Sequence, residues 1–212
     1  MSSMTTFFYL HGWASSPQSN KAQLFKQCFE QYGLNLQIPD LNQNDFFHLT
    51  LTRQIQQVQA LLPNSPVTLF GSSLGGLTAL WLAERQPQIQ RLVLLAPALN
   101  FLNHCITVMG EAQYAQWRKQ GELAVYHYGE QCERLLSYDF IQDIHQYVDT
   151  DLQRPIPTLI LHGRFDEIIS IQTARDFATS RPWIQLKEFD SDHGLNDVSL
   201  QLWQAAEEFC HM

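Results

Sequence analysis

The pentapeptide Gly-Ser-Ser-Leu-Gly at 71–75 constrains this chain more than any other feature of its sequence. It follows a short apolar run at 67–70 that predicts a buried strand, and it precedes a helical pattern at 74–85. In this context the spacing G-x-S-x-G places a serine on a very sharp strand-to-helix turn, where the two glycines remove side chains that would clash. The sequence therefore predicts a protruding, strained Ser73 that is a candidate nucleophile.

Short apolar runs alternate with segments of helical period along most of the 212 residues. This alternation is typical of an α/β fold, in which helices flank a mostly parallel central sheet. Continuous apolar runs, such as Leu-Val-Leu-Leu at 92–95, fit central strands that are buried on both faces. We expect strands near 6–10, 35–38, 67–70, 91–96, 158–162 and 184–189, and helices near 20–32, 50–62, 74–85, 171–180 and 198–209.

Residues 98–154 break this rhythm. The segment shows no clear strand, is rich in helix formers, and is too long for a plain connection. We interpret it as a helical lid inserted into a single domain that spans 1–212. Aromatic residues are frequent in the lid: Phe101, Tyr114, Trp117, Tyr126, Tyr128, Tyr138, Phe140 and Tyr147.

Composition and charge narrow the classes of function. The chain carries 13 basic and 21 acidic residues, a net charge of −8, so we expect neither nucleic acid nor an anionic membrane as a partner. No stretch approaches the ~18 to 20 apolar residues of a membrane span. Residues 1–6 lack the basic start and the long apolar run of a signal peptide. By elimination we expect a cytoplasmic protein with free thiols at its four cysteines, 28, 105, 132 and 210.

A serine nucleophile needs a base that takes its proton and an acid that orients the base. His193 lies in a polar loop between the last strand and the last helix, where we expect the base. Asp166 follows the strand at 158–162, and functional residues gather at such strand ends. His162, within that strand, is interpreted as a packed or hydrogen-bonded core residue. Three other carboxylates remain alternatives for the acid, of which the last two equally suit turn capping: Glu167, Asp190 and Asp192.

Two backbone amides are needed to hold a developing oxyanion. The residue after the nucleophile supplies one of them, so we expect the N–H of Leu74 to point at the site. The loop after the first strand, His-Gly-Trp at 11–13, supplies the other. Gly12 lets this backbone approach closely, and we assign the donor to Trp13, with Gly12 as the alternative. His11 is expected to hold the loop, and the Trp13 ring either lines an acyl pocket or packs in the core.

Four segments together resemble the α/β-hydrolase superfamily over nearly the whole chain: His-Gly-Trp at 11–13, Gly-Ser-Ser-Leu-Gly-Gly at 71–76, His-Gly-Arg-Phe-Asp-Glu at 162–167 and Ser-Asp-His-Gly at 191–194. Residues 8–22 are, more narrowly, similar to the opening of the small bacterial YqiA-like esterases. The resemblance implies an intracellular carboxylesterase or thioesterase. It places Ser73, Asp166 and His193 on the superfamily's triad positions.

These observations lead to one hypothesis and two alternatives. We expect a serine hydrolase that cleaves small-molecule esters or thioesters of small to medium acyl groups, without a metal or organic cofactor. Gly12, Trp13 and Trp117 are candidate substrate contacts, and the lid aromatics either form an apolar acyl pocket or pack the lid onto the core. The lid holds 4 basic and 8 acidic residues, which disfavours polyanionic coenzyme-A thioesters. Acyl transfer by the same triad and non-catalytic ligand binding remain alternatives, and the oligomeric state is left open.

Overall fold

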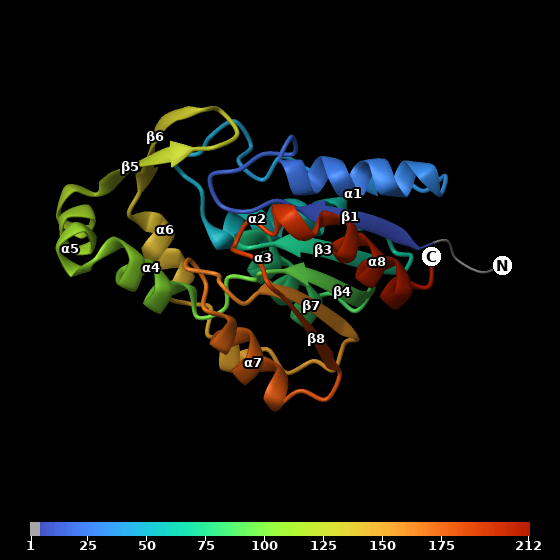
Figure 1. Cartoon of the computed structure of the whole chain (residues 1–212). Coiled ribbons are helices and arrows are strands. Elements are labelled where there is room, and N and C mark those ends of the chain that lie inside the picture. The colour runs from blue at the N-terminus through green and yellow to red at the C-terminus, as the bar shows by residue number, and fades with distance from the viewer. Residues whose placement is uncertain (1–4) are drawn as a thin grey trace.

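Six parallel strands form the central sheet of the structure, a computed structural model that describes residues 5–212 (Figure 1). Their spatial order is β2-β1-β3-β4-β7-β8, with neighbours paired in parallel throughout. The α/β prediction with a mostly parallel sheet is therefore confirmed. The strands are β1 (Thr6–Leu10), β2 (Leu36–Gln37), β3 (Val67–Ser72), β4 (Ile89–Leu95), β7 (Thr158–Gly163) and β8 (Ile184–Phe189).

Helices cover both faces of this sheet. Successive strand residues point to opposite faces, so Phe8 and Leu10 of β1 join one core cluster while Tyr9 joins the other. On the Tyr9 side, α1 and α8 pack together over the sheet (Figure 1). On the other side lie α2, α3 and α7. The bounds are α1 (Asn20–Gln31), α2 (Leu51–Leu61), α3 (Leu74–Arg85), α7 (Ile171–Thr179) and α8 (Ser199–Cys210).

Residues 98–154, called the cap below, lie for the most part beyond the carboxyl ends of the strands (Figure 1). The segment then returns to the start of β4, where the Arg154 side chain donates to the carbonyls of Gln86 and Ile89. The cap is not purely helical, which corrects the sequence-based expectation that it contains no strand. An antiparallel hairpin of β5 (Glu122–His127) and β6 (Cys132–Ser137) lies between its helices. Much of this hairpin is solvent-exposed, so its strands lack the apolar run of a core strand. The cap helices are α4 (Phe101–Met109), α5 (Glu111–Gln120) and α6 (Asp139–Ile144), followed by a 3₁₀ turn at Asp149–Asp151.

The fold brings the carboxyl ends of β1, β3, β7 and β8 to one edge of the sheet, facing the cap. The segments that directly follow these strands carry the site residues predicted from the sequence, except Trp117, which lies on α5. As for membranes, none of the helices within residues 5–212 has the length and apolar character needed to span a bilayer.

Candidate active site

Ser73 is the single residue between β3 and α3, and its backbone is strained. Its φ of 52° and ψ of −119° are a combination that costs a non-glycine residue about 1–3 kcal/mol. The flanking glycines make this turn possible by close approach. A methyl group on Gly71 would lie 2.5 Å from the carbonyl oxygen of Gly75. One on Gly75 would overlap the Leu10 carbonyl and lie 2.5 Å from the His11 carbonyl oxygen. The predicted strand-to-helix turn is thus present.

A chain of hydrogen bonds connects Ser73, His193 and Asp166. The Nε2 atom of His193 lies 3.1 Å from Ser73 Oγ, and its Nδ1 atom lies 2.7 Å from Asp166 Oδ2. The His193 side chain is 23% exposed, whereas that of Asp166 is 0% exposed. Because a carboxylate only accepts, Nδ1 carries the proton and Nε2 is left to accept the serine proton.

The alternative carboxylates do not reach His193. Asp190 is exposed and accepts a hydrogen bond from Arg164 at 2.6 Å. Asp192 caps its own turn, with Oδ1 accepting from the backbone of Gly194 at 2.8 Å. Glu167 is exposed to solvent. Asp166 is therefore the carboxylate that contacts the histidine.

Asp166 is held as an anion by the groups around it. Burial alone would raise the pKa of its carboxyl group, but hydrogen bonds from His162 and His193 hold this pKa well below its ordinary value. The backbone amides of Ile168 and Ile169 donate to Oδ1 at 2.9 and 2.8 Å. The carboxylate is thus oriented as well as charged.

The contact between His162 and Asp166 was not foreseen as part of the site. His162 is fully buried, and its Nε2 atom lies 3.1 Å from Asp166 Oδ2 and 2.9 Å from the carbonyl oxygen of Ile169. The next residue is Gly163, and a methyl group there would overlap the carbonyl group of Ser191. Glycine at this position therefore leaves room for the loop that carries His193. The sequence signal that points to this pair is a histidine near the end of a buried strand, four residues before Asp166.

The loop after β1 passes directly against Ser73. A methyl group on Gly12 would lie 3.3 Å from Ser73 Cβ and 4.0 Å from Ser73 Oγ. Within residues 5–212, the backbone amides of Trp13 and Leu74 donate to no protein acceptor, so both are free to bind an oxyanion. His11 holds this loop, because its Nδ1 atom lies 2.9 Å from the Gly12 carbonyl oxygen.

Aromatic residues of the cap cover this loop. The Trp13 ring stacks on Phe140, with centroids 6.0 Å apart, and meets Phe101 edge-on at 6.3 Å. Trp117, predicted as a substrate contact, lies instead behind Phe140 and is fully buried. Its ring N–H donates to the Leu136 carbonyl at 3.1 Å. The structure thus corrects the expectation for Trp117, which packs the cap and has no surface left for a ligand.

Solved structures of α/β hydrolases share this fold at low sequence identity. Mouse alpha/beta hydrolase domain-containing protein 10 superposes with a TM-score of 0.78 and 19% identity, over 97% of this chain and 90% of that one. Est1E from Butyrivibrio proteoclasticus superposes with a TM-score of 0.75 and 17% identity, over 100% of this chain and 90% of that one. A monoacylglycerol lipase from Paleococcus ferrophilus superposes with a TM-score of 0.71 and 16% identity, over 97% of this chain and 94% of that one. These matches establish the α/β-hydrolase fold.

Sequence comparisons add a family to this fold. Among curated proteins, none matches the chain significantly. The model of the family described as "Uncharacterised protein family (UPF0227)" matches residues 6–210, which include Ser73, Asp166 and His193. This match covers nearly the whole chain, so the protein is a member of the UPF0227 family with an α/β-hydrolase fold.

Proposed function

We propose that this protein is a serine hydrolase that cleaves carboxylic esters or thioesters. The observation that carries the proposal is the continuous chain of hydrogen bonds from Ser73 Oγ through His193 to Asp166, at 3.1 and 2.7 Å. Three groups that serve as nucleophile, base and orienting acid are in contact although they lie far apart in sequence. The strained backbone at Ser73 supports the same assignment, because strain of this kind gathers at functional sites.

The first half-reaction forms an acyl-enzyme. Ser73 Oγ attacks the carbonyl carbon of the substrate while its proton passes to Nε2 of His193. The carbonyl oxygen becomes an oxyanion that accepts hydrogen bonds from the amides of Leu74 and Trp13. As the tetrahedral intermediate collapses, the bond to the leaving alcohol or thiol breaks and His193 returns the proton to it.

The second half-reaction releases the acid. His193 takes a proton from water, whose oxygen attacks the acyl carbon, and Ser73 leaves with that proton. Asp166 keeps the imidazole in the tautomer with a proton on Nδ1 and stabilises its cation at each step. The hydrogen bonds to Asp166 support this role, because they keep the carboxylate charged and fixed.

The cap and the loop after β1 favour an apolar acyl group. Gly12 borders Ser73, and Phe101 and Phe140 of the cap contact the ring of the following residue, Trp13. An acyl chain bound beside Ser73 would meet the partly exposed rings of Trp13 and Phe101, which suit hydrocarbon and not charge. We therefore assign small to medium acyl groups as substrates, with residues 98–154 acting as a lid within the single domain.

The test is the hydrolysis of p-nitrophenyl acetate, butyrate and octanoate by the wild type and by Ser73→Ala. We expect turnover that falls by about 10⁴-fold or more in the variant, because it lacks the nucleophile. Ser72→Ala is the matched control, since it makes the same change one residue away, and we expect it to stay within a few-fold of the wild type. Equal turnover by the wild type and Ser73→Ala would remove Ser73 from the mechanism.

A further inference from the structure

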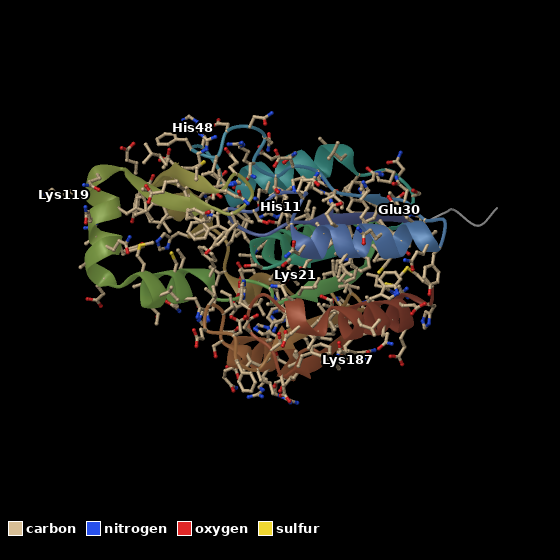
Figure 2. All side chains as sticks on the ribbon, turned by 45° about the horizontal axis from the view of Figure 1, so that its top comes forward. His11, Lys21, Glu30, His48, Lys119 and Lys187 are labelled. Atoms are coloured by element: carbon tan, nitrogen blue, oxygen red, sulfur yellow. The ribbon has the colours of Figure 1, made fainter. Side chains whose placement is uncertain are left out.

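A lysine from a distant part of the chain reaches the loop that carries His193. Lys21 lies in the first turn of α1, in the stretch that resembles the opening of YqiA-like esterases, and Figure 2 labels it at the start of that helix. Its Nζ atom donates to the carbonyl oxygen of Gly194 at 2.9 Å and lies 3.4 Å from that of His193. The contact joins the first helix to the loop between β8 and α8.

We propose that Lys21 is a positioning residue for His193: its ammonium holds the two carbonyl groups that set the path of the histidine loop. The inference deepens the proposed function and rests on it. An imidazole that transfers a proton must stay within hydrogen-bond reach of the serine oxygen. A small displacement of this loop would lengthen the 3.1 Å separation between His193 Nε2 and Ser73 Oγ.

The hydrogen bonds inside the loop do not use the carbonyl groups of His193 and Gly194, which face Lys21. Asp192 Oδ1 accepts from the amides of Gly194 and Leu195 at 2.8 and 3.2 Å, which fixes the local turn. In the part of the chain that the structure describes, the carbonyls of His193 and Gly194 accept no other hydrogen bond from protein. Lys21 therefore supplies the anchor of these groups to the rest of the fold.

The helix that carries Lys21 is itself rigidly placed. Phe25 and Phe29 are fully buried against the sheet, so the first turn of α1 has little freedom to move. The preceding segment is tied to the helix, because the Gln23 side chain donates to the Pro17 carbonyl at 2.8 Å. This segment continues from the loop of Gly12 and Trp13. Helix α1 thus connects the loop after β1 with the histidine loop.

The charge of Lys21 makes the anchor sensitive to alkaline pH. Burial lowers the pKa of Lys21 to about 8, although Asp166 and Asp192 act in the opposite direction. Besides these carboxylates, the titratable group at the contact is His193, whose carbonyl the ammonium faces. Hydrogen bonds from a charged donor are roughly twice as strong as those from a neutral one. The anchor is therefore strong at neutral pH and weakens above about pH 8.

The experiment compares Lys21→Met with Lys26→Met. Methionine keeps a long apolar side chain but removes the ammonium, and Lys26 is exposed on the same helix. For Lys21→Met at pH 7 we expect kcat on p-nitrophenyl butyrate to fall about 10- to 100-fold, with KM within about threefold, because binding is retained while the base is misplaced. The ratio of wild-type to Lys21→Met rates should shrink above about pH 8, whereas Lys26→Met should follow the wild type at every pH.

A second readout separates this inference from the choice of substrate. Diethyl p-nitrophenyl phosphate phosphorylates an activated serine, and its rate measures Ser73 and His193 without any acyl ester. We expect the same loss in Lys21→Met, and rescue by Lys21→Arg, whose guanidinium stays charged at all these pH values. Thermal melting checks that each variant is folded. If Lys21→Met does not fold, the inference is tested by the wild type and Lys21→Arg alone: the wild-type rate should fall at alkaline pH, and the Lys21→Arg rate should not.

Failure of the inference and failure of the proposed function are distinguishable. Equal rates for Lys21→Met and Lys26→Met across pH 6 to 10 would overturn the role of Lys21 and leave the serine mechanism intact. If the wild type reacts with the phosphate in a Ser73-dependent way but hydrolyses no ester, the proposed substrate class fails while the phosphorylation rates still decide on Lys21. A wild type that reacts with neither reagent would overturn both.

Discussion

Asp166 contacts two histidines with the same oxygen atom. His193 Nδ1 and His162 Nε2 lie 2.7 and 3.1 Å from Oδ2, while the other oxygen accepts two backbone amides. Although burial raises the pKa of the Asp166 carboxyl group, hydrogen bonds from the two histidines hold this pKa well below its ordinary value, so the group is a charged carboxylate at neutral pH. We infer that its main role is to fix one tautomer of His193.

Asp166→Asn should therefore abolish most of the activity while the fold survives. An amide can turn its NH₂ group toward Nδ1, which favours the tautomer whose Nε2 atom carries the proton and cannot accept one. We expect kcat on p-nitrophenyl butyrate to fall about 10⁴-fold at pH 7. Asp190→Asn is the control, because that side chain is 70% exposed and pairs with Arg164. A loss below about tenfold in Asp166→Asn would show that the tautomer is set by other contacts.

At the scale of elements, the turn from β3 to α3 depends on glycines that permit close approach. A methyl group on Gly75 meets the backbone of β1, which cannot move aside, whereas one on Gly33 meets no atom within 4 Å. We expect Gly75→Ala to lower the free energy of unfolding by about 3 kcal/mol or more. Gly33→Ala should lower the free energy of unfolding by about 1 kcal/mol, because only its positive φ of 66° disfavours a side chain there. Urea unfolding of both variants checks this, and equal costs would contradict it.

The cap is the element on which substrate length is expected to depend. Phe101 of α4 is partly buried and meets both Trp13 and Phe140, so its removal opens space beside the Trp13 ring. For Phe101→Ala we expect the ratio of kcat/KM on octanoate to that on acetate to rise about tenfold. Tyr126→Ala removes an aromatic residue that is 50% exposed on β5 and should leave the ratio unchanged. An unchanged ratio in Phe101→Ala would place the acyl chain elsewhere.

Across the whole molecule, much of the sheet and of the candidate site could be predicted because local patterns determine them. The strand order brings the ends of β3, β7 and β8 to one edge, so residues that follow these strands meet without further information. The hairpin in the cap escaped prediction because its exposed strands carry no apolar run. The burial of Trp117 and the reach of Lys21 to Gly194 depend on packing between distant segments, which no local pattern encodes.

The charge of the whole molecule predicts how it treats anionic substrates. The net charge is −8, and the cap holds 4 basic and 8 acidic residues, so a polyanionic coenzyme-A thioester approaches against a repulsive field. Salt screens such a field, since the Debye length falls from about 30 Å at 0.01 M to about 8 Å at 0.15 M. We expect kcat/KM on a butyryl coenzyme-A thioester to rise about 3- to 10-fold over this range. The neutral N-acetylcysteamine thioester of the same acid shares the reacting bond and should show no such rise. If the coenzyme-A thioester instead reacted more slowly at high salt, basic residues near the site would be attracting it, and polyanionic thioesters would become the favoured substrates.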